Sequence, residues 1–318
     1  MSKTHLSKAE SALGLSARNW WSIIKRTFVH LQRHNISLIS AGVAFYCLLA
    51  IFPLLGATIA LYGLVVSPES LQEHMSMLVS VVPADSRYII EEKLSDLTEK
   101  SSSALGWGFF LTLLLSLWSS SKGANALITA CNITYIEDNG RGFFTGMLAR
   151  IVCTIAMIAT VIVALLCISV LPELISSFYG GLMSDKQAEW FTWPVLLVLF
   201  NFCLSALYRY APHRRAAQWR WVTPGSLFST VLWIVASYGF SFYLNEFASY
   251  NETYGSVGGI IILLMWLYLS AYIILIGAEV NSSIELQTTA DSTIGEDKPM
   301  GERNAVVADN TPKDLKQS

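Results

Sequence analysis

Residues 255–278 read GSVGGIIILLMWLYLSAYIILIGA, a run of 24 positions without a charged side chain. An α-helix of that length extends about 36 Å, at about 1.5 Å per residue. The hydrocarbon core of a bilayer is about 30 Å thick, and a helix satisfies its backbone hydrogen bonds internally, as lipid requires. The run therefore predicts a helix that spans a membrane.

Five other stretches meet the same demand, so the sequence predicts an all-α membrane protein with a bundle of about six transmembrane helices. The first stretch, Ile36 to Val66, is longer than a perpendicular span needs, so we expect a tilt, or a break near Pro53. The bundle occupies residues 36–286, with spans at about 36–66, 104–121, 151–171, 190–208, 222–244 and 255–278.

Composition supports a membrane protein. Of the 318 residues, 53% are hydrophobic and 14% charged, whereas soluble domains carry about 25% charged residues. The net charge of -2 points to neither a nucleic-acid partner nor an acidic substrate. The five cysteines are scattered without a CxxC pair, which is typical of buried apolar positions, not of a disulfide framework or a metal site. The polar, basic N-terminus lacks the apolar core of a secretory signal, so we expect it to be retained.

Charge placement predicts the orientation. Of the 21 Lys and Arg residues, 17 fall in the N-terminal segment, the loops after the second and fourth spans, and the C-terminal tail. Positive charge concentrates on the cytoplasmic side of membrane proteins. We therefore expect a multi-pass protein of the bacterial inner membrane, with both termini in the cytoplasm.

Three segments lie outside the spans. Within residues 1–35, the stretch 17–33 has helical apolar spacing, and either lies in the cytoplasmic interface or packs against the bundle. Residues 67–103 show two short amphipathic patterns, which predict a small external helical cap. Residues 287–318 are polar and poor in large apolar side chains, which predicts a disordered cytoplasmic tail.

Polar groups at membrane depth are costly, so each is a candidate functional residue. Asn201, near the middle of its span, either lines a solute path or forms an interhelical hydrogen bond, and we favour the hydrogen bond. Tyr46 and Pro53 in the first span mark either a broken helix whose backbone binds a solute or a packing kink.

Two polar residues follow the last span. Glu279 and Asn281 lie at its cytoplasmic end, where Glu279 has either a gating role or a structural ion pair with an arginine cluster, residues 209–215. At the other end of this span, Gly255 and Gly259 form a small face that lets another helix approach closely, a weakly specific packing motif.

The cytoplasmic loop 208–221, YRYAPHRRAAQWRW, combines aromatic residues with four arginines, Arg209, Arg214, Arg215 and Arg220. Such a mixture can bind RNA. In so short a loop beside a membrane, the topology signal and contact with anionic lipid headgroups explain it better. We expect the lipid bilayer as partner, and no nucleic acid.

Enzyme motifs are missing. The sequence has no phosphate-binding glycine loop and no nucleophile elbow. His30 and His34 share a helix face, but no acidic residue stands beside them in the sequence to complete a metal site. We therefore predict no catalytic residue, no cofactor and no metal, and we do not expect an enzyme.

Four segments together resemble the YihY/BrkB family of bacterial inner-membrane proteins, and the resemblance covers roughly Ser16 to Leu286. They are AGVAFYCLLAIFPLL (41–55), SLWSSSKGANALITACNITY (116–135), YRYAPHRR with RWVTPGSL (208–227), and YNETYGSVGGIIILLMWLYLSAYIILIGAEVN (250–281). The resemblance implies architecture and location more than activity: some members resemble virulence-associated proteins, and others have carried a ribonuclease label.

Three functions follow, in this order. The first is a transporter or lipid-handling protein of the envelope, because of the long first span and the polar residues near span ends. The second is a non-catalytic membrane scaffold or virulence-associated factor, acting as a homo-oligomer or with an envelope partner. The third, a membrane-bound ribonuclease, lacks the clustered histidines and aspartates with which a metal-dependent nuclease activates water.

Overall fold

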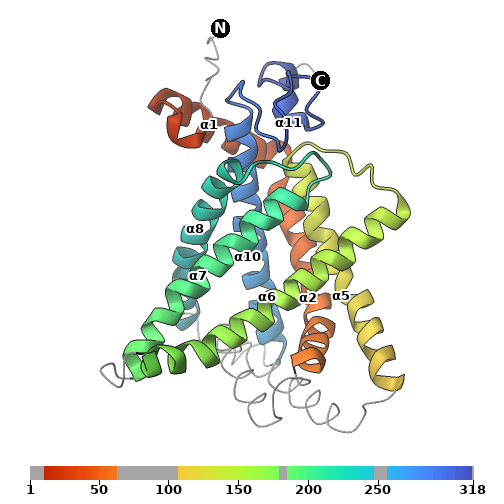
Figure 1. Ribbon diagram of the computed structural model, residues 1–318, viewed down its shortest axis with the longest axis vertical. Helices are drawn as coiled ribbons and strands as arrows, with labels where there is room; N and C mark the ends of the chain where they lie inside the picture. Colours follow the sequence, from red (N-terminus) through yellow and green to blue (C-terminus); the bar gives the residue numbers. More distant parts are fainter. Residues whose placement is uncertain (1–10, 63–106, 179–184, 247–255, 317–318) are drawn as a thin grey trace.

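The computed structural model describes residues 11–62, 107–178, 185–246 and 256–316, and these are almost entirely helical (Figure 1). Their only β-type pairing is an isolated bridge between Ala217 and Thr293. The helices are α1 (Ala17–Arg33), α2 (Ile36–Tyr62), α5 (Trp107–Thr134), α6 (Phe143–Phe178), α7 (Asp185–Tyr210), α8 (Trp219–Glu246), α10 (Ser256–Glu285) and the short α11 (Val306–Asp309), with 3-10 turns at Ala12–Gly14 and Asp314–Lys316. The all-α prediction is confirmed.

In the described part of the chain, six long helices pack in a closed ring. Helix α2 contacts α5 and α10, α10 contacts α8, and α8 contacts α7. Helix α6 lies between α7 and α5 and completes the circuit. Each helix therefore has two main neighbours, and much of its remaining surface faces outward.

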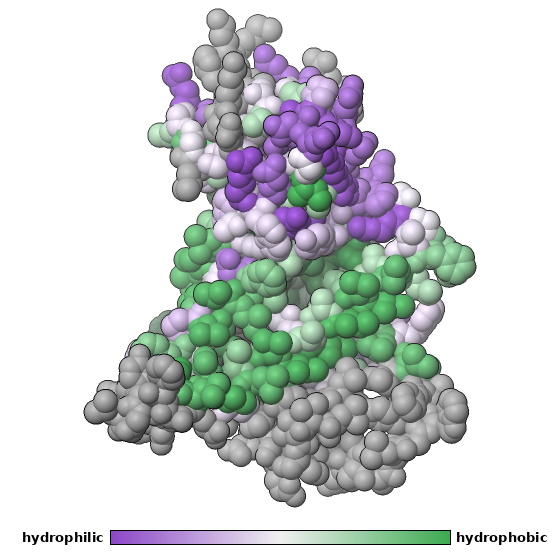
Figure 2. All heavy atoms as spheres, in the orientation of Figure 1, coloured by the Kyte–Doolittle hydropathy of each residue, from purple (hydrophilic) through white to green (hydrophobic). Residues whose placement is uncertain are grey.

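The outward surface is apolar. Exposed large side chains include Leu115, Val198 and Phe242, and Figure 2 shows a broad hydrophobic band below a hydrophilic end. By length and hydropathy, four described helical stretches can each cross a membrane, at 143–172, 190–210, 219–244 and 258–285. A fifth candidate is the pair Ala17–Arg33 and Ile36–Ile51, which is bent by 64°. A helical membrane protein is thus confirmed, and the described residues alone contain four or five candidate spans, where the whole sequence predicted about six.

Several boundaries differ from the prediction. Helix α5 continues from the apolar run through SSSKGAN to Thr134, so Lys122 lies in a helix and not in a loop. Helix α2 continues through Pro53 to Tyr62, so of the two alternatives, a tilt or a break, the described residues show no break. The predicted external cap (67–103) and Gly255 lie outside the described residues.

Helix α1 packs on the bundle by one face only. The Ser16 hydroxyl caps its N-terminus by accepting a hydrogen bond from the Asn19 amide at 3.3 Å. Ile23 is buried toward α10, whereas Trp21 and Phe28 are exposed on the opposite side. The alternative in which this segment packs on the bundle is therefore supported, while its position in the cytoplasmic interface stays a prediction.

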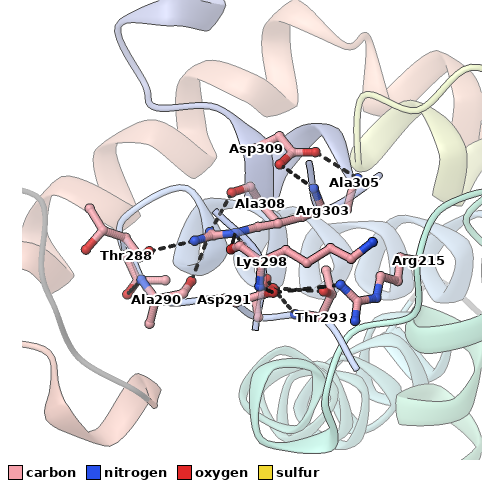
Figure 3. Close-up of polar contacts among 12 residues, drawn as sticks. Arg215, Thr288, Ala290, Asp291, Thr293, Lys298, Arg303, Ala305, Ala308 and Asp309 are labelled. Atoms are coloured by element: carbon pink, nitrogen blue, oxygen red, sulfur yellow. Dashed lines mark hydrogen bonds and ion pairs between the residues drawn. The ribbon is translucent and has the colours of Figure 1, made fainter. Parts of the chain in front are cut away.

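The C-terminal segment 287–316 is packed on the hydrophilic end of the molecule, beside α1 (Figure 1), so the prediction of a disordered tail is wrong. The buried Arg303 guanidinium donates to four backbone carbonyls, and the Asp309 carboxylate accepts three backbone N–H groups (Figure 3). Composition missed this segment because paired polar groups, and few large apolar ones, hold it together.

Helices α8 and α10 approach closely at two glycines. A Cβ built on Gly277 would lie 2.6 Å from the carbonyl oxygen of Gly225 and 2.6 Å from the Tyr208 hydroxyl. Across this contact, the Ser229 hydroxyl donates to the carbonyl of Ile273 at 3.0 Å. The predicted packing glycine Gly259 is also buried in α10, but Gly225 and Gly277 form the tight contact, which the sequence analysis did not identify.

Candidate functional site

A groove of about 560 Å³ lies between α2, α5 and α6, and we call it the basic groove. Its polar lining residues are Tyr46, Lys122, Asn125, Thr129 and Arg150. Tyr46 was a candidate from the sequence, and its side chain is 44% exposed. Lys122 and Arg150 contributed only to the predicted orientation in the membrane.

Small residues create the basic groove. No atom lies within 4 Å of a Cβ built on Gly42, so this part of α2 leaves open space, and Ala126 and Ala130 of α5 line the same groove. Nearby, a Cβ on Gly123 would lie 2.9 Å from the Cβ of Ala50, so α2 and α5 touch there without a gap. The groove is therefore a property of the helix surfaces, and not of a loose bundle.

The cations lie well inside the helices. Lys122 stands twelve residues before the end of α5 at Thr134, which is about 18 Å along a helix axis. Arg150 is seven residues from the start of α6, about 10 Å along its axis, and its Nε donates to the Gly146 carbonyl. Among the described residues, neither cation forms an ion pair with a carboxylate. The groove thus offers two unneutralised positive charges and a phenol to an anionic ligand.

Asn201 makes the interhelical contact that we favoured. Its Nδ2 donates to Thr230 Oγ1 at 3.3 Å, which joins α7 to α8. Asn201 does not line the basic groove.

Asn281 also joins helices. Its Oδ1 accepts from the Gly225 amide at 2.7 Å, and its Nδ2 donates to the Val222 carbonyl at 2.9 Å. These bonds surround Pro224, which has no N–H to continue the helical pattern of α8. Asn281 therefore stabilises the first turns of α8 from α10.

Glu279 does not pair with the arginine cluster, so of the two alternatives the ion pair is wrong, and the gating role stays a prediction. Its carboxylate is fully buried, and Oε1 lies 2.5 Å from Nδ1 of His34. Oε2 lies 3.5 Å from Nδ1 of His30. No acidic residue is adjacent to these histidines in the sequence, so no metal site was expected there, but the fold supplies a carboxylate from 245 residues away.

Three of the four arginines in the loop 208–221 contact other parts of the protein. Arg214 forms a buried bidentate pair with Glu285 at 3.0 and 2.7 Å and lies over the Tyr135 ring. Burial alone would lower the pKa of Arg214, but the Glu285 charge outweighs it and raises the pKa. Arg215 contacts the C-terminal segment at Glu296, and Arg209 lies over the Trp219 ring.

The role in headgroup contact that the sequence suggested for this loop therefore does not fit Arg214. Of the four arginines in this loop, Arg220 is the exposed one. Trp221 is buried, whereas Trp190 and Trp193 are exposed.

The ring of apolar helices, the hydrophobic exterior and the hydrophilic end define a helical membrane protein. This chain belongs to the family described as Virulence factor BrkB, whose model matches residues 27–301. The resemblance found in the four sequence segments is thereby confirmed.

Relatives are similar over most of the chain. A Bacillus subtilis (strain 168) protein named "Putative ribonuclease-like protein YfkH" is 35% identical over 274 residues, which cover 82% of this chain and 94% of that protein. A "UPF0761 membrane protein" of Kangiella koreensis is 26% identical over 80% of this chain and 62% of its own length. The "UPF0761 membrane protein PSHAa0171" of Pseudoalteromonas translucida is 26% identical, with 80% and 83% covered. No solved structure matches the chain.

Proposed function

We propose that this membrane protein handles anionic lipids and that the basic groove binds a phosphate-bearing headgroup. The observation that carries the proposal is the pair of cations, Lys122 and Arg150, which line one groove without carboxylate partners among the described residues. A charge at membrane depth is costly, so an unneutralised pair favours a ligand that neutralises it. Basic pockets between transmembrane helices are typical sites for anionic headgroups.

The surroundings of the groove support a lipid more than a small soluble anion. Ile39, Val43 and Ile133 line the same groove and offer contact to acyl carbons. Helix α6, which carries Arg150, also exposes Val152 and Ile155 outward. A lipid could therefore place its phosphate at the cations while its chains stay in the bilayer.

The proposal includes an orientation in the inner membrane. The hydrophilic end carries α1, in which four of 17 residues are Lys or Arg, and the C-terminal segment, which adds four more Lys and Arg. We place this end in the cytoplasm, because positive charge concentrates there. The basic groove would then accept lipids from the cytoplasmic leaflet, which is rich in anionic headgroups.

The test is lipid binding and lipid movement by the purified, reconstituted protein. Wild-type protein should retain phosphatidylglycerol or cardiolipin through purification and should accelerate the exchange of fluorescent anionic lipid between leaflets of liposomes. The double variant Lys122→Ala and Arg150→Ala should lose both. Hydrogen bonds to charged groups contribute about 1.5–3 kcal/mol each, so removal of either cation should weaken retention about tenfold or more.

A matched control removes the same charges elsewhere. Lys298 and Lys313 are exposed on the C-terminal segment and lie outside the groove, so the variant Lys298→Ala and Lys313→Ala should keep the retained lipid. Equal retention in the groove variant and the control would refute the groove as the binding site. Retention without exchange would limit the function to lipid binding.

A further inference from the structure

Three side chains from opposite ends of the sequence meet between α1 and α10. They are His30, His34 and Glu279, and one potential ligand atom from each lies within 4.8 Å of the other two. Among the described residues, no other group of histidine, cysteine and acidic side chains meets this distance criterion. We propose that these residues bind a divalent transition-metal ion of the zinc class.

Helix α1 places the two imidazoles on one of its faces. His30 and His34 are four residues apart, the spacing that places two side chains on one face of a helix. Their ring centroids are 5.1 Å apart. The i, i+4 histidine pair is the arrangement with which helices bind zinc in metalloproteases, where a carboxylate can be the third ligand.

The third ligand is held in place independently of the histidines. One turn before His30, Arg26 donates to the Ser283 carbonyl at 3.0 Å and to Gln287 Oε1 at 2.7 Å. These bonds fix α1 on α10 one turn beyond Glu279. The register of the two helices therefore does not depend on the cluster, and the ligand atoms are preorganised.

Two atoms of the cluster lack a hydrogen bond among the described residues. They are Oε2 of Glu279 and Nδ1 of His30, which are both buried and 3.5 Å apart. The Glu279 side chain is 0% exposed, and those of His30 and His34 are 12% and 13% exposed. A buried polar atom without a partner is costly, and an ion between these atoms would satisfy both.

The distances suit a small tetrahedral ion. Ligands about 2.0–2.1 Å from zinc in tetrahedral geometry lie about 3.3 Å apart. The 3.5 Å separation of His30 Nδ1 from Glu279 Oε2 is close to this value. The 2.5 Å contact of His34 with Glu279 must open by somewhat less than 1 Å, because a metal would replace the hydrogen between them.

The donor types select the ion. Two imidazoles and one carboxylate suit zinc and neighbouring transition metals, whereas magnesium and calcium prefer oxygen ligands. Three protein ligands leave a fourth position, which a water or a ligand can occupy. This inference is independent of the basic groove, since none of the three residues lines it.

The experiment is metal binding by tag-free, full-length protein in detergent. After chelation and buffer exchange, we expect the wild type to bind about one Zn²⁺ per chain and to show a raised melting temperature with Zn²⁺ but not with Mg²⁺. Cobalt should give the intense visible absorption of a tetrahedral site. His30→Phe should weaken zinc binding by at least about 100-fold, because even partners outside the ligand set contribute about 10- to 100-fold.

His30→Phe is the informative variant because His30 Nδ1 makes no hydrogen bond to a described residue, so its loss should leave the fold intact. Glu279→Gln is the second variant, and should lose zinc as well. His213→Ala is the matched control: His213 is exposed and is not one of the three cluster residues, so zinc binding should be unchanged. Wild type that binds no zinc, or folded His30→Phe that binds it as wild type does, would overturn the site.

Discussion

The close approach of α8 and α10 at Gly277 gives a sharp test of the packing. Gly277→Ala adds one methyl group to α10 where α8 leaves no room. The new Cβ would lie 2.6 Å from both the Gly225 carbonyl oxygen and the Tyr208 hydroxyl, and closer still to Ser229 Oγ. Carbon and oxygen atoms need more than 3 Å, so α10 and α8 must separate by about 1 Å.

The expected cost follows from the contacts that separation would break. Overpacking costs about 1–3 kcal/mol. The bonds from Tyr208 to the Ile274 carbonyl at 2.7 Å and from Ser229 to the Ile273 carbonyl at 3.0 Å cross the same contact, and each contributes about 1 kcal/mol. Alanine recovers about 0.5–1 kcal/mol through its greater helix propensity. We expect a net loss of about 2–4 kcal/mol.

Reversible unfolding of the purified protein in mixed micelles by added SDS should measure this loss. The control is Gly239→Ala in α8, because no atom lies within 4 Å of a Cβ built there. This control should be neutral or slightly stabilising. A Gly277→Ala variant as stable as Gly239→Ala would refute the close approach of α8 and α10.

Three further predictions concern the hydrophilic end. Glu285→Gln should destabilise the protein by about 3–5 kcal/mol, because it leaves the buried Arg214 charge unpaired, and the double change to methionine at both positions should cost less when compared by the same unfolding assay. Burial raises the pKa of Glu137 to about 7 from an ordinary 4.5, against the opposing hydrogen bond from the Val306 amide. The folded state therefore holds a proton that the unfolded chain releases, and this stability is present below about pH 4.5 and is lost as pH rises through about 7. Melting temperatures over that range should fall less steeply in Glu137→Gln than in wild type. Arg303→Lys should expose the C-terminal segment to limited proteolysis, since one ammonium cannot reach all four carbonyls that the guanidinium bonds; an unchanged cleavage pattern would contradict that role.

The sequence predicted most of the helices but not all of their ends. Hydropathy falls at SSSKGAN, so the second span was ended at Ser121, although the helix continues to Thr134. Ser120 and Thr134 donate their hydroxyls to carbonyls three residues earlier, so they are satisfied within the helix. Hydropathy reports the surroundings of a helix and not its continuity, which explains the error.

The candidate site residues were also predicted only in part. Tyr46 and Glu279 were identified as costly polar groups, and both lie at sites of interest. Arg150, which lines the same groove as Tyr46, and His34, which contacts Glu279, were not assigned to them, because the sequence does not show which faces of two helices meet. The C-terminal segment was misjudged for a related reason: Asp291 accepts three hydrogen bonds within that segment, and no periodic pattern reveals such pairing (Figure 3).

By itself, the sequence determined that this is a helical membrane protein of the BrkB family. Lipid forces each span to satisfy its backbone within about 20 residues, so apolar length is a local and readable signal. Only the tertiary structure decided that Glu279 meets two histidines, that Lys122 and Arg150 share a groove, and that Arg214 is buried against Glu285. These pairings depend on the rotation and register of helices that are distant in the chain, and those are set by packing around the whole ring.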